Sequence, residues 1–205
     1  MKTFACMVAL CLVQPAWAQD SGAVLRQSYN GKFGFYRPAP ALSNGLAFGV
    51  DGMTEFVKLG FYASLGADLY LKQSFNPFDT PPPQIEQQSL ILIPIMLSAG
   101  LKVVDVADAD TRIYLGAGGG YTLFFYKVVY SSGSGGFLDP GLGSTEHDKS
   151  SGTLTGSLQA RVVVGKIFLE PKLYFAGLFK QDVEGGHRYT IDPSGFIITL
   201  GYSYK

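Results

Sequence analysis

Hydrophobic and polar residues alternate along most of the chain, and the alternation is clearest at residues 57–72. The odd positions there are apolar from Val57 to Leu71, whereas the even positions hold Lys58, Asp68 and other polar, tyrosine or glycine residues. A period of two over this length predicts a β-strand with one apolar and one polar face. The run is also longer than the roughly 9 to 11 residues that a tilted strand needs to cross a bilayer.

The same period recurs in other segments and predicts eight strands in all. They are expected at residues 29–37, 45–53, 57–72, 89–104, 111–130, 153–165, 167–180 and 196–204. Short connections are expected at 54–56, 105–110 and 165–166, and longer ones at 73–88, 131–152 and 181–193, with 38–44 the shortest on its side. An even number of strands joined alternately by short and long connections is typical of a barrel in a bacterial outer membrane. We therefore predict an all-β fold, an eight-stranded antiparallel up-and-down transmembrane β-barrel.

The charged residues within these segments lie on the polar faces. A charge turned toward hydrocarbon would cost about 2 to 4 kcal/mol at the middle of the bilayer, so we expect the apolar faces to contact lipid. The interior of an eight-stranded barrel is just wide enough for side chains. We therefore predict a polar network that fills the interior, formed by Asp51, Lys58, Tyr62, Asp68, Arg161, Glu170, Lys172 and Tyr174.

The composition favours a membrane environment over water. Charged residues make up 16% of the chain, against roughly 25% in an ordinary soluble domain, and aromatic residues reach 14%. Tyr70, Tyr130 and Tyr204 lie near strand ends, where they suit the aromatic belts of a membrane interface. The 16 basic and 16 acidic residues cancel, so we expect no nucleic-acid partner.

The first 18 residues have the pattern of a secretory signal peptide. Lys2 precedes an apolar run at residues 4–13, and Ala16-Trp17-Ala18 fits the small-residue site at which leaders are cleaved. We predict cleavage after Ala18, which leaves residues 19–205 as one outer-membrane β-barrel domain. Both cysteines lie within residues 1–18, so the mature chain is expected to form no disulfide.

A soluble β-barrel or sandwich would produce the same alternation with its faces reversed. The period alone does not separate the two folds. Low charge, long strands and aromatic residues near strand ends favour lipid. A soluble carrier of an apolar ligand stays open as an alternative.

Two motifs resemble those of small outer-membrane β-barrel proteins of Gram-negative bacteria. Residues 114–121 read Tyr-Leu-Gly-Ala-Gly-Gly-Gly-Tyr, like a glycine-rich strand common in that group, and residues 92–95 read Leu-Ile-Pro-Ile, like a strand of the general outer-membrane β-barrel domain. Over residues 19–205 the chain resembles the OmpA-, OmpX- and OmpW-like proteins. The resemblance implies a place in the cell outer membrane and insertion by the barrel-assembly machinery. One departure is that Lys205 follows Tyr204, whereas such chains usually end on an aromatic residue.

Two features within the predicted strands indicate local packing. Pro94 has no backbone N–H to donate to a neighbouring strand, and proline within a sheet is normally confined to edges or bulges. We therefore predict a bulge there. Gly116, Gly118 and Gly120 share one face and leave room for a bulky residue, Tyr62 or Tyr70, unless the strand simply bends at this point.

Candidate chemistry is sparse. His147 and His187 are expected in external loops, and neither they nor the acidic residues within 105–110 have the ligand number and spacing of a metal site. His187 with Ser194 would be the pair to seek for a rim-located nucleophile, but no third orienting group is evident. We predict no catalytic residue, no metal site and no cofactor.

The sequence leaves three classes of function. We favour a structural or surface-interaction barrel that acts through its external loops and is not an enzyme. The alternatives are a narrow conduit for ions or small apolar solutes, and a soluble periplasmic carrier of an apolar ligand. The expected partners are outer-membrane lipid and, during insertion, the barrel-assembly machinery, and we expect a monomer.

Overall fold

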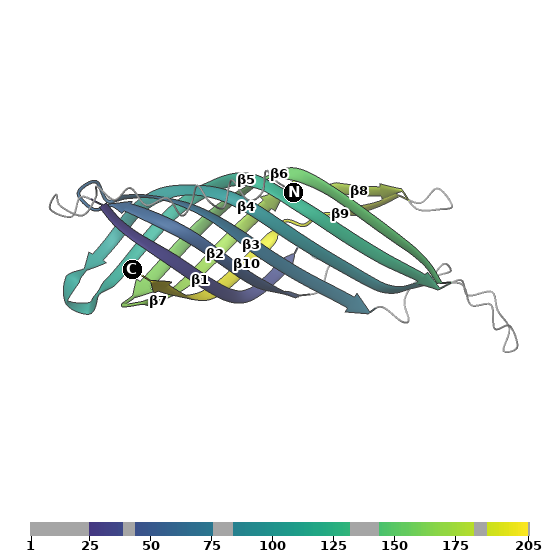
Figure 1. Cartoon of the computed structure of the whole chain (residues 1–205), viewed down its shortest axis with the longest axis horizontal. Coiled ribbons are helices and arrows are strands. Elements are labelled where there is room, and N and C mark those ends of the chain that lie inside the picture. The colour runs from purple at the N-terminus through teal and green to yellow at the C-terminus, as the bar shows by residue number, and fades with distance from the viewer. Residues whose placement is uncertain (1–24, 39–43, 76–83, 132–143, 183–187, 205) are drawn as a thin grey trace, which may run out of the picture.

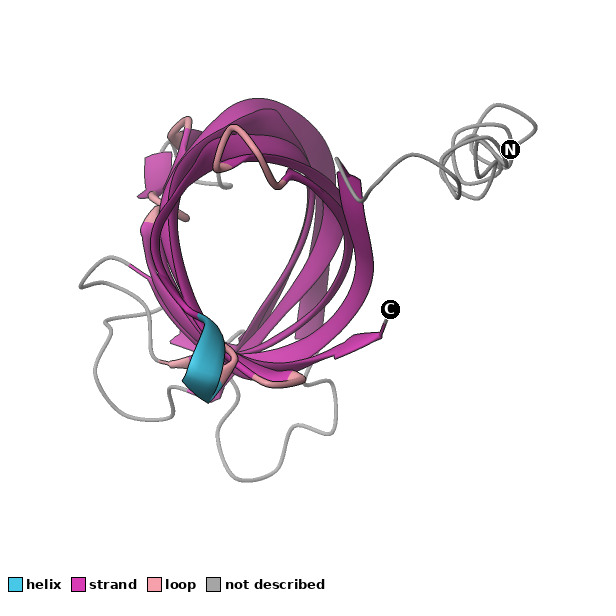
Figure 2. Cartoon of the chain, turned by 90° about the vertical axis from the view of Figure 1, so that its left-hand side faces the viewer, coloured by secondary structure: helices cyan, strands magenta, loops and turns pink. Residues whose placement is uncertain are grey.

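The computed structural model describes residues 25–38, 44–75, 84–131, 144–182 and 188–204. Eight strands form a closed antiparallel barrel in the order β1-β10-β7-β6-β5-β4-β3-β2, and two short strands form a separate hairpin. Figure 1 shows the strands crossing the molecule obliquely, and Figure 2 shows the closed ring end-on. The barrel strands are β1 (Leu25–Pro38), β2 (Gly45–Phe56), β3 (Phe61–Phe75), β4 (Gln84–Val106), β5 (Thr111–Ser131), β6 (Ser144–Val164), β7 (Ile167–Ala176) and β10 (Gly195–Tyr204). The hairpin is β8 (Phe179–Asp182) with β9 (Arg188–Ile191), and η1 (Ala107–Ala109) is a short 3-10 turn.

The predicted eight-stranded up-and-down barrel is confirmed. Each barrel strand pairs with its neighbour in sequence, apart from the β8–β9 hairpin inserted before β10. The first and last strands close the ring through a register that runs from Tyr29 opposite Tyr204 to Pro38 opposite Gly195. The predicted signal peptide at residues 1–18 lies outside the described residues.

One predicted strand begins too early. Residues 57–60 form the turn between β2 and β3, which was expected at 54–56. The turn is closed by the Leu59 amide, which donates to the Phe56 carbonyl at 3.0 Å, and by Gly60, whose φ of +63° favours glycine. The alternation continued through this turn only because Val57 and Leu59 keep the parity of the strand that follows.

Three strands extend well beyond their predicted bounds at the end opposite these short turns. β3 ends at Phe75 and not at 72, β4 begins at Gln84 and not at 89, and β6 begins at Ser144 and not at 153. Residues 144–152, expected in a loop, pair with β5, so that His147 lies opposite Val128. The segment Ser-Thr-Glu-His-Asp-Lys-Ser-Ser is polar at every position, and without alternation a strand leaves no periodic signal.

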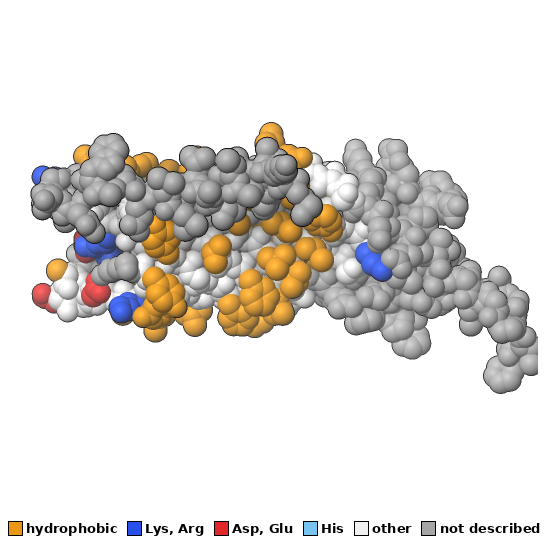
Figure 3. Space-filling model, viewed as in Figure 1, with side chains coloured by type: hydrophobic (Ala, Val, Ile, Leu, Met, Phe, Trp, Pro, Cys, Tyr) orange, Lys and Arg blue, Asp and Glu red, His pale blue; other side chains and the backbone are white. Residues whose placement is uncertain are grey.

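The outer surface of the barrel is apolar, and the buried charged residues lie inside. Leu158 and Leu200 on the outer surface are 52% and 56% exposed, whereas Arg161 and Glu170 in the interior are 5% and 1% exposed. Figure 3 shows hydrophobic side chains gathered along the middle of the barrel, with charged groups at the end that carries the short turns. This distribution is the reverse of a soluble barrel, in which the apolar face would point inward. Separately, no helix among the described residues is long and apolar enough to span a bilayer.

The predicted bulge at Pro94 is wrong. Pro94 lies opposite Thr122 in a continuous β4–β5 register, and the shifts lie instead between Ile85 and Gln87 and between Lys102 and Val104. On the β3 side, the pairing pauses opposite Pro94 and resumes in the same register. The pairing of β4 with β3 is therefore interrupted at Pro94, but β4 contains no extra residue there.

Of the three β5 glycines, Gly116 makes room for Tyr62, as one of the two interpretations predicted, whereas Gly118 lies against Ser98 and Gly120 against the Ile95 backbone. A Cβ atom at Gly116 or Gly100 would collide with the ring of Tyr62. Tyr62 therefore packs closely against Gly100 of β4 and Gly116 of β5 on the inner wall of the barrel.

Candidate functional site

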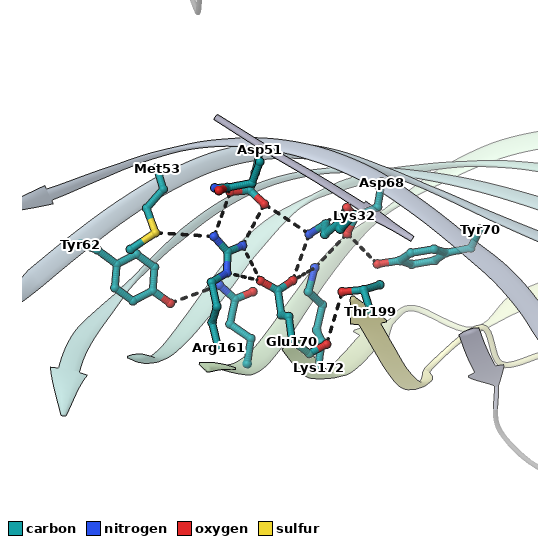
Figure 4. Close-up of polar contacts among 12 residues, drawn as sticks. Lys32, Asp51, Met53, Tyr62, Asp68, Tyr70, Arg161, Glu170, Lys172 and Thr199 are labelled. Carbon is teal, nitrogen blue, oxygen red and sulfur yellow. Dashed lines mark hydrogen bonds and ion pairs between the residues drawn. The ribbon is translucent and has the colours of Figure 1, made fainter. Parts of the chain in front are cut away.

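Six charged side chains meet in the middle of the barrel interior and form what we call the ionic network. Three are cations and three are anions, and none of their side chains is more than 6% exposed. They come from five strands around the ring (Figure 4). The network consists of Lys32 on β1, Asp51 on β2, Asp68 on β3, Arg161 on β6, and Glu170 and Lys172 on β7.

Arg161 joins two sides of the barrel. Its Nε donates to Glu170 Oε2 at 2.7 Å, and its Nη1 and Nη2 donate to the two oxygens of Asp51 at 3.2 and 2.8 Å. The guanidinium carbon also lies 4.6 Å from the centre of the Phe168 ring. The planar fork of an arginine suits this two-sided pairing, which a lysine would not reproduce.

The two lysines complete the network. Lys32 Nζ lies 3.0 Å from both Glu170 Oε1 and Asp68 Oδ1 and 3.6 Å from Asp51 Oδ2. Lys172 Nζ lies 2.8 Å from Asp68 Oδ2 and 3.4 Å from Glu170 Oε1. Every carboxylate therefore contacts at least two cations, which compensates charges that would otherwise be costly to enclose.

Apolar and aromatic side chains cover the ionic network on both sides. Toward the short turns lies a cluster of Met53, Tyr62, Tyr114, Val163 and Phe168. Toward the other end lies a larger cluster, which we call the upper cluster, formed by Tyr36, Ala47, Tyr70, Leu90, Leu92, Met96, Phe124, Tyr126, Tyr174 and Ile197. Figure 4 shows Met53 and Tyr62 on one side of the charges and Tyr70 on the other. Excluding water in this way strengthens each electrostatic contact and raises the cost of breaking one.

Three tyrosine hydroxyls of these clusters make hydrogen bonds in the interior, and that of Tyr70 bonds directly to the ionic network. Tyr70 donates to Asp68 Oδ2 at 2.8 Å, and Tyr62 accepts from Gln159 Nε2 at 3.2 Å. Tyr174 shares a hydrogen bond with Thr122 at 2.5 Å. The buried hydroxyls thus have partners, as polar groups in a dry interior require.

A second group of charges lies at the end with the short turns. We call it the mouth cluster, and it consists of Arg26, Glu55, Lys102, Asp110 and Arg112. Glu55 accepts from Tyr114 at 3.0 Å and from Arg26 at 3.5 Å. Lys102 Nζ lies 2.8 Å from Glu55 Oε1 and forms an ion pair with it. Arg112 donates to Asp110 at 2.9 Å.

Seven of the eight residues proposed for the interior network lie there, and Lys58 does not. Asp51, Tyr62, Asp68, Arg161, Glu170, Lys172 and Tyr174 are all buried in the interior. Lys58 is exposed in the turn at 57–60, because β3 begins only at Phe61. Its even parity placed it on the polar face of a strand that does not extend that far.

Lys32 is the network residue that sequence reasoning missed. It lies in a segment whose odd positions, Phe33 and Phe35, are apolar and face outward. Its even position is therefore the signal that indicates an inward charge. Glu55 of the mouth cluster is not predicted either, because the sequence places a turn over residues 54–56.

Two small cavities lie within the described part of the interior. A cavity of about 30 Å³ lies among the mouth cluster, lined by residues including Arg26, Glu55 and Arg112. Another of about 10 Å³ lies beside the ionic network, lined by residues including Ser64 and Ser98. A cavity needs roughly 10 to 15 Å³ to hold one buried water, so these two cavities suit a few water molecules at most.

The residues considered for chemistry do not assemble into a site in the described part of the chain. Ser194 Oγ is engaged by the backbone of Ala176, accepting from its amide at 3.0 Å and donating to its carbonyl at 3.3 Å. His187 lies outside the described residues, and only the backbone of His147 is described, within β6. No group of three or more potential metal ligands occurs among the described residues.

Comparisons with solved structures concern this architecture. A major outer membrane protein from Thermus thermophilus is similar with a TM-score of 0.50 and 11% identity, over 88% of this chain and 99% of that one. The fold is that of the small outer-membrane β-barrels. Neisserial surface protein A (NspA) matches with a TM-score of 0.45 and 12% identity, over 90% of this chain and 99% of that one. Ail, the attachment invasion locus protein of Yersinia pestis, matches with a TM-score of 0.45 and 8% identity, over 88% of this chain and 98% of that one.

Sequence comparisons add no family to this likeness. No protein-family model matches the sequence, and no curated protein is similar to it.

Proposed function

We propose that this protein is an integral outer-membrane barrel with a closed interior, which serves as a rigid support for the strands and loops that it presents outside the cell. The observation that carries the proposal is the reversed distribution of polarity. Six charges are enclosed at the centre, while large apolar side chains such as Leu154 and Leu158 are 79% and 52% exposed. A surface of this kind is stable in hydrocarbon and would associate in water.

The two ends of the barrel suggest its orientation. Short turns at 57–60, 107–110 and 165–166 lie at one end, and in outer-membrane barrels short turns face the periplasm. The extended parts of β3, β4 and β6 lie at the opposite end, which would face outward. We therefore place the surface-interaction role at that end.

The packed interior argues against the two alternative functions. A conduit needs a continuous path, whereas the ionic network and the upper cluster occupy the interior, and the two cavities described there measure only about 30 and 10 Å³. A carrier of an apolar ligand needs an apolar cavity, whereas the centre of this barrel is occupied by paired charges. Lipid is then the partner of the outer surface. One chain forms the complete closed barrel, which fits a monomer inserted by the barrel-assembly machinery.

A pair of matched leucine substitutions tests the membrane assignment. Leu158→Lys places a charge at an outward position in the middle of β6, and Leu59→Lys places one in the turn at 57–60, where Leu59 is 76% exposed. We expect Leu158→Lys to lower the free energy of unfolding in lipid vesicles by about 2 to 4 kcal/mol and Leu59→Lys by at most about 1 kcal/mol. Both proteins are measured by urea titration, and their recovery in the outer-membrane fraction is compared.

Equal stability and equal membrane recovery for the two variants would mean that Leu158 faces water. That result would reject the membrane assignment. Step-like currents from the unmodified protein in a planar bilayer would instead favour the conduit.

The surface role is tested by shortening one external connection. Residues 132–143, which lie outside the described part of the chain, are replaced by a short Gly-Ser turn between β5 and β6. Cells producing either protein are compared for outer-membrane content and for adhesion to one another and to hydrophobic glass. We expect equal membrane content and a several-fold loss of adhesion for the shortened protein, whereas unchanged adhesion would leave a purely structural role.

A further inference from the structure

The segment that connects β9 to β10 is tied to the strands on both sides of β10. We call residues 192–194 the strap. Pro193, which is buried, accepts a short hydrogen bond from the Tyr36 hydroxyl of β1. Ser194 accepts from the Ala176 amide of β7 at 3.0 Å and donates to the Ala176 carbonyl at 3.3 Å. The strap therefore links β1 and β7 across the strand that lies between them.

The strap is also braced internally and lies at the end of the closing seam. Asp192 Oδ1 accepts from the Ser194 amide at 2.9 Å, which fixes the turn that leads into β10. Immediately after it, Gly195 pairs with Pro38 on one side and with Tyr174 on the other. The strap thus lies next to the last pair of the β1–β10 seam, at the end opposite the short turns.

Tyr36 connects the strap to the buried interior. Its side chain is 0% exposed, and its ring stacks on that of Tyr70 with centroids 5.1 Å apart. Tyr70 in turn donates to Asp68 of the ionic network. The Tyr36 hydroxyl bonds to the strap while its ring stacks on Tyr70. Breaking the contact to the strap should therefore disturb the packing of the upper cluster.

We propose that the strap is a latch that holds the outer end of the barrel interior closed, so that water and small solutes reach the upper cluster only when the Tyr36 contact to Pro193 breaks. Opening of this kind is a local event that costs less than global unfolding. The latch goes beyond the proposed function, since it concerns access to the interior and not the role of the outer surface.

A cysteine reporter in the upper cluster measures the opening. Ala47 is 1% exposed and belongs to the same cluster as Tyr36, and the sequence has no cysteine after residue 11. In the protein folded in detergent or vesicles, Ala47→Cys is treated with a small charged methanethiosulfonate reagent. We expect slow labelling in this background and labelling about five- to tenfold faster after Tyr36→Phe, the effect of losing one hydrogen bond on an opening equilibrium.

Tyr174→Phe is the matched control. Tyr174 is also a buried tyrosine of the upper cluster, but its hydroxyl bonds to Thr122 and not to the strap. We expect its labelling rate to stay close to that of the reporter alone. Ser194→Ala removes the anchor of the strap on Ala176, so the Tyr36 contact to Pro193 should break more often, and we expect labelling to accelerate as it does after Tyr36→Phe.

Folding of each variant is checked by its different migration on a gel before and after boiling. Equal labelling of the reporter with and without Tyr36→Phe would overturn the latch. Equal acceleration by Tyr174→Phe would overturn it too, because the interior would then be loosened by any lost hydroxyl. If Tyr36→Phe does not fold, Ser194→Ala decides by the same comparison. None of these outcomes bears on the leucine test of the membrane assignment.

Discussion

The ionic network and the mouth cluster use the same kinds of charged side chains in different surroundings. In the network every partner is enclosed, and Glu170 is 1% exposed. In the mouth cluster Glu55 is as deeply buried, at 2%, but its partner Arg26 keeps 40% of its side chain exposed. Water screens a charge that it can reach, so the energetic consequences of similar ion pairs should diverge between the two regions.

The largest effect is expected in the network. Glu170 lies near Lys32, Arg161 and Lys172, so Glu170→Gln leaves three buried cations with two carboxylates. Breaking a buried pair by removing one partner typically costs about 3 to 5 kcal/mol. We expect a loss of this size in the free energy of unfolding, measured by urea titration in lipid vesicles.

Gln keeps the shape of Glu, so packing should be little changed by this substitution. An unfolding midpoint equal to that of the unmodified protein would show that the network contributes no net electrostatic stability. The difference between the two clusters would then have no energetic meaning.

A smaller effect is expected in the mouth cluster. Glu55→Gln weakens contacts to Tyr114, Lys102 and Arg26, and losing a hydrogen-bond acceptor for charged groups costs about 1.5 to 3 kcal/mol. Arg26→Ala is the control and should cost no more than about 1 kcal/mol, because its pair with Glu55 is long and partly solvated. Both are measured by the same titration, at low and high salt.

Salt sharpens the comparison between these variants. Added salt should shrink the small effect of Arg26→Ala, since exposed charges are screened, and should leave that of Glu170→Gln almost unchanged. If Arg26→Ala proved as costly as Glu170→Gln at both salt concentrations, exposure would not be what separates the two clusters.

Much of this fold could be predicted from the sequence because a strand in lipid must alternate. Each outward position has to be apolar and each inward one can be polar. The even or odd position of Leu158 and Arg161 in the strand is therefore enough to predict which face each lies on. The same rule failed at Lys58, because a turn can keep the parity of the strand that follows. It also gave no signal at residues 144–152, which are polar on both faces and lie in the extended part of β6.

The partners within the ionic network could not be predicted in the same way. Parity shows that Asp51 and Arg161 point inward, but it does not show that they meet across the interior. That meeting depends on the tilt of the strands and on the stagger of the whole ring. Small inward residues such as Gly116 and Ser98 matter as much, since they leave the space that large side chains on other strands occupy.

The seam between β1 and β10 has a consequence for the order of assembly. Tyr29 and Tyr204 come together from opposite ends of the chain, and contacts of such long sequence separation form slowly. Lys32 enters the ring on β1, yet Glu170 comes from β7, two places beyond the seam. Until the final strand arrives, this lysine lacks one of its anions, so its ammonium group should need water until the ring is complete. Pairing of β1 with β10 and loss of water from the barrel centre would therefore occur together, late in biogenesis.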